Sequence, residues 1–85
     1  MTTTRLATPA ALADVEPLAT AVADTADGTF VIRVYLGPDA DRVTEVVTLD
    51  GAPEGEPTGT TLEGETPQEY ADYRAASYLR ARGAA

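Results

Sequence analysis

The ionisable and nucleophilic side chains of this chain form a narrow set, and that set determines which chemistry the chain could support. Its 85 residues include no histidine, cysteine or lysine, and Ser77 is the single serine. Proton transfer near neutral pH usually relies on histidine, and covalent catalysis relies on a nucleophile that an adjacent base activates. The sequence places no such base beside Ser77. We therefore expect a protein that is not an enzyme and that requires no cofactor.

Carboxylates are the remaining groups that could act on a substrate or hold a metal ion. Asp39 and Asp41 have the spacing that opens a calcium-binding loop, but the next ligand position is Val43, and the loop glycine and terminal glutamate are missing. Zinc sites need nitrogen or sulfur ligands, which this chain lacks. Carboxylate pairs also cleave glycosides, but only within a cleft that so short a chain rarely forms. The pattern predicts a solvated turn and no metal site.

The charge balance points to the kind of partner. Fourteen acidic residues face six arginines, which gives a net charge of −8. Phosphate groups require cation-rich surfaces, so we expect no direct binding to nucleic acid or to an anionic membrane, and a protein partner with a basic or apolar patch instead. Two further interpretations need no partner. Abundant alanine without lysine or asparagine is typical of a GC-rich genome, and a carboxylate-dense surface is typical of adaptation to high salt.

Residues 50–66 concentrate the acidity. This segment is rich in glycine and proline and has no basic residue, a composition typical of loops. A run of acidic residues in a loop is either simply solvated or able to dock on a basic surface. The candidate docking residues are Asp50, Glu54, Glu56, Glu63 and Glu65.

The C-terminal segment contains the most specific local pattern. Thr66-Pro67-Gln68-Glu69 is a capping box with proline at the first helical position, and it predicts a helix over 67–82 that ends at Gly83. Helical spacing places alanines, Tyr78 and Leu79 on a core-facing side. On roughly the opposite side we predict a protein-binding surface, since tyrosine and arginine are enriched in interface hot spots. Its residues are Tyr70, Tyr73, Arg74, Ser77 and Arg80. The alternative is that Tyr70 or Tyr73 only covers the core, with its hydroxyl in water.

Two other elements precede this helix. After a loosely held stretch over 1–7, apolar residues recur at steps of three and four and predict a helical segment over 8–27, broken or kinked near Pro17. Residues 29–36 alternate with period two, and a second β-rich run covers 43–49, so residues 29–49 are predicted to form an antiparallel hairpin with apolar residues on both faces.

Together these elements predict a small α+β fold in a single domain covering residues 1–85: an N-terminal helix, an antiparallel β-hairpin, an acidic Gly/Pro loop and a C-terminal helix. The apolar runs are too short to cross a bilayer. We expect a cytoplasmic protein, or one incorporated into a virus particle.

The leading functional interpretation is a non-catalytic protein-binding module, most simply an accessory or structural subunit of a larger assembly such as a virus or phage particle. Homo-oligomerisation is compatible with it. One alternative is an acidic mimic of nucleic acid that inhibits a DNA-binding protein by occupying its basic groove. Another is a small regulatory protein of a halophilic or GC-rich organism. Binding that collapses with salt favours the mimic, and folding that requires molar salt favours the halophilic protein.

Overall fold

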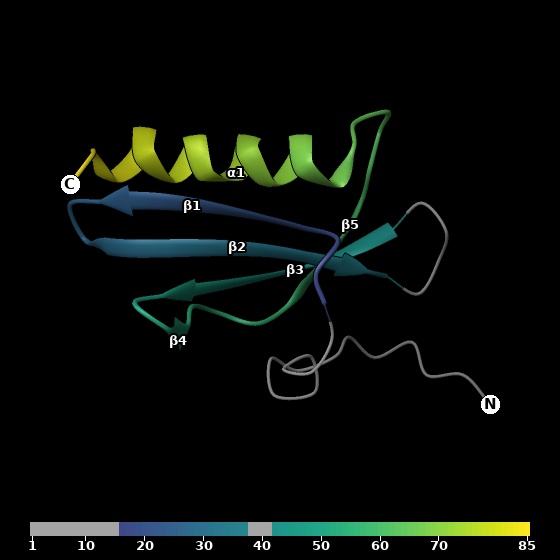
Figure 1. Ribbon diagram of the computed structural model, residues 1–85, viewed down its shortest axis with the longest axis horizontal. Helices are drawn as coiled ribbons and strands as arrows, with labels where there is room; N and C mark the ends of the chain where they lie inside the picture. The colour runs from purple at the N-terminus through teal and green to yellow at the C-terminus, as the bar shows by residue number, and fades with distance from the viewer. Residues whose placement is uncertain (1–15, 38–41) are drawn as a thin grey trace.

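The computed structural model describes residues 16–37 and 42–85, which form an antiparallel sheet of five strands and one helix (Figure 1). β1, β2 and β3 are consecutive neighbours, and the short β4 and β5 both pair with the outer side of β3. The elements are β1 (Ala19–Thr25), β2 (Gly28–Leu36), β3 (Arg42–Leu49), β4 (Ala52–Pro53), β5 (Thr58–Thr61) and α1 (Pro67–Arg82). The class is therefore mostly β with one helix.

The predicted N-terminal helix is wrong. Residues 19–25 form β1, which pairs with β2 through the two-residue turn Ala26-Asp27, and residues 8–15 lie outside the described residues. Alanine favours helices intrinsically, but pairing and burial override so weak a preference. The segment Ala-Thr-Ala-Val-Ala-Asp-Thr also alternates with period two, buried and exposed in turn. Gly28, which the helix prediction used as a helix end, is instead the first residue of β2 and directly follows the turn.

Alanines form the contact between α1 and the sheet. α1 lies along one face, over β1 and β2 (Figure 1). Three alanines of β1 and two of α1 are buried in the core there: Ala19, Ala21, Ala23, Ala71 and Ala75. Short side chains on both elements let the helix approach the strands closely.

β2 supplies the large side chains of this core. Phe30, Ile32 and Val34 are fully buried on the face that α1 covers. On the opposite face Tyr35 and Val46 are also buried. The antiparallel pairing of β2 with β3, and the apolar residues on both of its faces, confirm the predicted hairpin.

The predicted acidic loop contains more regular structure than expected, because Asp50 and Gly51 form a tight turn. Both have positive φ angles, 51° and 90°, as a hairpin turn of this type requires, so the chain folds back and β4 pairs with the end of β3. The Asp50 carboxylate accepts a hydrogen bond from the Thr29 backbone N–H at 2.9 Å. Gly28 has a φ of 135°, which other residues rarely adopt, and a Cβ there would lie 2.5 Å from that carboxylate, so the position favours glycine.

The outer side of β1 is tied to both ends of α1. The Gln68 side-chain amide donates a hydrogen bond to the Thr20 carbonyl at 3.0 Å. Beyond the other end of the helix, the Ala85 N–H donates to the Asp24 carbonyl at 3.1 Å. β4 lies at the edge of the sheet opposite β1. Backbone N–H groups of an antiparallel strand point alternately toward and away from its neighbour, and the nitrogen of Pro53 points away from β3. Its missing N–H therefore costs no hydrogen bond between β3 and β4.

The C-terminal helix is confirmed, and its capping box is present. The Thr66 hydroxyl accepts from the Glu69 N–H at 3.1 Å, and the Glu69 carboxylate accepts from the Thr66 N–H at 2.8 Å. Within residues 16–37 and 42–85 no helix is long and apolar enough to cross a membrane.

Candidate functional site

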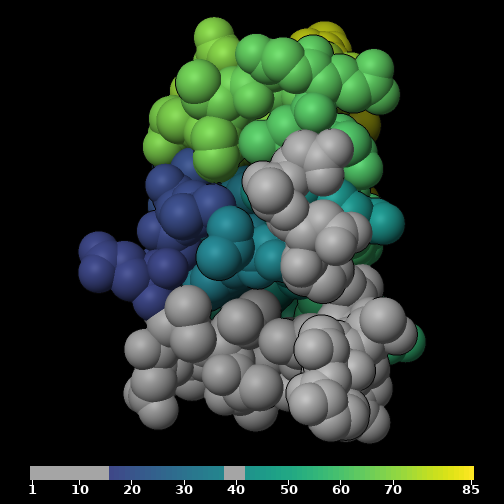
Figure 2. Space-filling model, turned by 90° about the vertical axis from the view of Figure 1, so that its right-hand side faces the viewer, coloured from purple at the N-terminus to yellow at the C-terminus, as the bar shows by residue number. Residues whose placement is uncertain are grey.

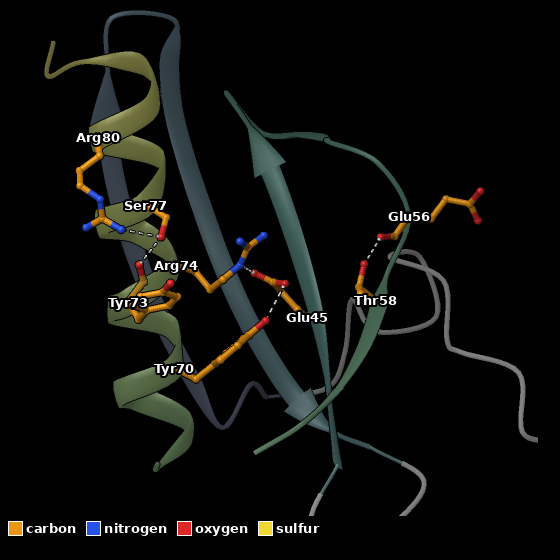
Figure 3. A network of polar contacts seen from close by, with 8 residues as sticks. All are labelled: Glu45, Glu56, Thr58, Tyr70, Tyr73, Arg74, Ser77 and Arg80. Carbon is orange, nitrogen blue, oxygen red and sulfur yellow. Dashed lines mark hydrogen bonds and ion pairs between the residues drawn. The ribbon is translucent and has the colours of Figure 1, made fainter. Parts of the chain in front are cut away.

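The five predicted binding residues lie on two different sides of α1. Tyr70 and Arg74 point toward the sheet, where both contact Glu45 of β3 (Figure 3). The Tyr70 hydroxyl donates to one carboxylate oxygen at 3.1 Å, and the Arg74 Nε donates to the other at 2.8 Å. Tyr70 is half-buried and packs against the core. The predicted grouping of these two residues with Tyr73 on an outward side is therefore not what the structure shows.

Glu45 is the only buried carboxylate in the described part of the chain, with 5% of its side chain exposed. It belongs to β3 and lies opposite Val34 of β2, on the face that α1 covers. A buried charge is strongly unfavourable unless it is paired and hydrogen-bonded. Arg74 and Tyr70 supply the opposite charge and a second donor, so Glu45 joins the sheet to α1.

The same contacts shift the ionisation of the two helix residues. Burial raises the pKa of the Tyr70 hydroxyl above 10.0, and the nearby negative charge of Glu45 raises it further. The hydrogen bond to Glu45 raises the pKa of Arg74, so the guanidinium stays charged.

Tyr70 should therefore affect stability at alkaline pH. Its contribution is complete below pH 10.0 and is lost as the pH rises through its higher folded-state pKa, because the unfolded chain then releases the proton more readily. We expect wild-type stability to fall above pH 10 more steeply than that of Tyr70→Phe. Urea unfolding between pH 8 and pH 11.5 measures this, with Tyr73→Phe as the matched control. Identical pH profiles for wild type and Tyr70→Phe would contradict the expected coupling.

The other three predicted residues lie together on the outward side. Tyr73 is 62% exposed. The Ser77 hydroxyl donates to the Tyr73 carbonyl at 3.0 Å, and Arg80 Nη2 donates to the Ser77 hydroxyl at 3.1 Å (Figure 3). These bonds hold Ser77 and Arg80 against the helix and leave the ring of Tyr73 open to solvent.

Between these two groups α1 carries an open hollow of about 250 Å³. Its lining consists of Arg74, Ser77, Tyr78, Ala81 and Arg82. The guanidinium carbons of Arg74 and Arg82 lie 5.4 Å and 5.8 Å from the centre of the Tyr78 ring. Two cations therefore lie close to one aromatic ring in a shallow depression.

Arg82 is held by the sheet as well. Its Nη1 lies 3.1 Å from the Asp27 carboxylate, and its guanidinium carbon lies 4.9 Å from the centre of the Phe30 ring. Phe30 stacks on Tyr78, with ring centres 4.5 Å apart. Sequence reasoning missed Arg82 and Tyr78 as site residues, although the spacing of 74, 78 and 82 puts them along one helical side. It also missed Glu45, although a charged residue within an otherwise apolar strand indicates that the strand buries a paired carboxylate.

The structure does not bring the acidic residues of 50–66 into one patch. Asp50 and Glu54 lie near the β3–β4 turn, whereas Glu63 and Glu65 lie in the link between β5 and α1, at the opposite end of β3 (Figure 1). Glu56 points outward from the connection between β4 and β5 (Figure 3). Figure 2 views the end at which α1 begins, where this link and the first turn of α1 lie over the strand ends.

No protein-family model, curated protein or solved structure matches this chain. The function has to be inferred from the surfaces of the molecule. Among the described residues no group of three or more histidine, cysteine, aspartate or glutamate side chains could hold a metal ion, and the pair Asp39 and Asp41 lies outside them.

Proposed function

We propose that this chain is a non-catalytic protein-binding module, an accessory or structural subunit of a larger assembly, and that it contacts its partner through the outward side of α1. The observation that carries the proposal is the exposed ring of Tyr73 beside the hydrogen-bonded pair Ser77 and Arg80. Tyrosine and arginine provide large contact areas and donors at interface hot spots.

The rigidity of α1 supports this surface. The capping box fixes the start of the helix, and Glu45 holds its middle to the sheet through Tyr70 and Arg74. A side chain on a fixed helix loses less conformational freedom on binding than one on a loop, so more of its contact energy remains available for affinity. Tyr73 is such a side chain, because it lies exposed on this fixed helix.

The acidic-mimic alternative has weaker support. An inhibitor that imitates nucleic acid needs its carboxylates along one continuous surface. The five carboxylates of residues 50–66 are instead spread over the two ends of β3 and the connection between β4 and β5. We therefore place the contact on α1.

Affinity purification from the native host, after nuclease treatment and with low-salt and high-salt washes, tests the proposal. We expect a stoichiometric partner that survives high salt. Tyr73→Ala should reduce its recovery about tenfold, as loss of a hot-spot residue does. Val22→Ala is the matched control, because Val22 is 55% exposed on the sheet face opposite α1.

Circular dichroism should show equal helix content in the two variants. Equal recovery of the partner with Tyr73→Ala and Val22→Ala would overturn the placement on α1. A DNA-processing partner that washes off as salt rises, whatever the residue at position 73, would favour the acidic mimic instead.

A further inference from the structure

We infer that the hollow beside Tyr78 receives a carboxylate side chain from the partner protein, an inference that rests on the proposed function. The hollow adjoins the outward surface, since Ser77 lines it and also bonds Arg80. A partner that covers Tyr73 and Ser77 would therefore extend over it.

The local charge favours an anion. Three arginines lie along this part of α1, and two of them have a carboxylate partner: Arg74 pairs with Glu45, and Arg82 with Asp27. Arg80 pairs with no carboxylate in the described ranges and donates to the Ser77 hydroxyl instead. The charge of Arg80 is therefore not balanced by a carboxylate among the described residues, and it lies on the same helix as the two guanidiniums near the Tyr78 ring. A single incoming carboxylate would balance it.

The hydrogen-bond donors favour the same group. Arg74 uses its Nε for Glu45, and its two terminal nitrogens make no hydrogen bond to another described residue. The terminal nitrogens of a guanidinium match the two oxygens of a carboxylate. Arg82 uses Nη1 for Asp27 and retains further donors, and its guanidinium carbon lies 5.8 Å from the centre of the Tyr78 ring.

The small volume of the hollow and the net negative charge of the chain favour a single protein side chain as the ligand over a small molecule or a nucleic acid. The volume of about 250 Å³ lies below the range of about 300–1,000 Å³ that is usual for small-molecule sites. Nucleic acid would bring a row of phosphates toward a molecule whose net charge is −8, and repulsion would exceed the attraction of a single unpaired arginine. An isolated glutamate or aspartate on an otherwise neutral or basic partner avoids that repulsion.

Titration of the ¹⁵N-labelled chain with the blocked peptide Ac-Ala-Glu-Ala-NH₂ tests the inference, with Ac-Ala-Gln-Ala-NH₂ as the uncharged control. We expect the glutamate peptide to shift the Nε–H signals of Arg74 and Arg82 and the Tyr78 ring signals. The dissociation constant should be on the order of 1–10 mM, because one exposed ion pair is weak. Ala81→Glu, which places a carboxylate in the hollow, should weaken binding at least about tenfold. Thr20→Glu adds the same charge to the face opposite α1 and should leave binding unchanged.

Equal shifts with the glutamine peptide, or none with either peptide, would overturn the inference. So would inorganic phosphate that shifts the same signals at lower concentration than the glutamate peptide. Partner recovery with Ala81→Glu separates this inference from the proposed function. If recovery falls for Tyr73→Ala and stays at the wild-type level for Ala81→Glu, the module stands and the carboxylate site fails.

Discussion

Replacing Arg74 with methionine is expected to lower the free energy of unfolding by about 3 kcal/mol. The substitution keeps most of the packing volume but leaves the Glu45 carboxylate, 5% exposed, without its cation. Removing one partner of a buried ion pair costs about 3–5 kcal/mol, and the low end applies because Arg74 is 34% exposed and water can enter where it was. A domain of this length has only about 4–13 kcal/mol of stability in total, so the loss would be a large fraction of it.

Urea unfolding followed by circular dichroism measures this loss. The informative comparison is Glu45→Met combined with Arg74→Met, which removes both charges. We expect the double variant to recover at least half of the loss, because apolar side chains of similar volume replace buried ion pairs well. Tyr70→Phe should be added to it, so that no hydroxyl is left without an acceptor. If Arg74→Met costs less than about 1 kcal/mol, the pair is no stronger than an exposed salt bridge.

Phe30→Ala is expected to lower the free energy of unfolding by about 3–5 kcal/mol, as aromatic-to-alanine changes in a core do. Phe30 is fully buried, and the alanines that the adjacent β1 contributes are too short to fill the space that its ring would leave. The change also removes the stacked partner of Tyr78 and the ring beneath Arg82.

Thermal and urea unfolding of Phe30→Ala and Phe30→Leu measure the effect, with leucine retaining most of the volume. We expect Phe30→Leu to cost less than half as much. Equal losses in the two variants would mean that the aromatic stack, rather than the cavity, dominates. A loss below about 1 kcal/mol for alanine would contradict the placement of Phe30 in the core.

The sequence was most informative where one local pattern had one structural solution. The capping box at Thr66 and Glu69 and the alternation of residues 29–36 each specify an element without help from the rest of the fold. Residues 19–25 were ambiguous, because an alanine-rich run with apolar steps of three, four and two satisfies both helical and strand periodicity. Only pairing with β2 and close packing against α1 select the strand, and neither is local.

The candidate site was less predictable for a similar reason. Helical spacing correctly separated Tyr73 and Ser77 from the core-facing alanines, but it could not show that Tyr70 and Arg74 reach across to Glu45. That contact depends on β3 pairing with β2, which α1 covers, and on Glu45 lying on the same face of the sheet as the helix. The hollow lined by Arg74, Tyr78 and Arg82 likewise depends on Phe30 and Asp27, which are distant in sequence.

The hydrogen bonds along the outer side of β1 have a consequence for the behaviour of the protein at high concentration. A strand at the border of a sheet offers unpaired backbone groups to any other chain, which is a common route to fibrils. Here the Gln68 side chain donates a hydrogen bond to the Thr20 carbonyl, and the Ala85 N–H donates to the Asp24 carbonyl. Between these two positions, Val22 is the one residue that alternates in register with Thr20 and Asp24. At the opposite border Pro53 presents a nitrogen without a hydrogen. Part of each margin is therefore protected against strand-by-strand growth of the sheet.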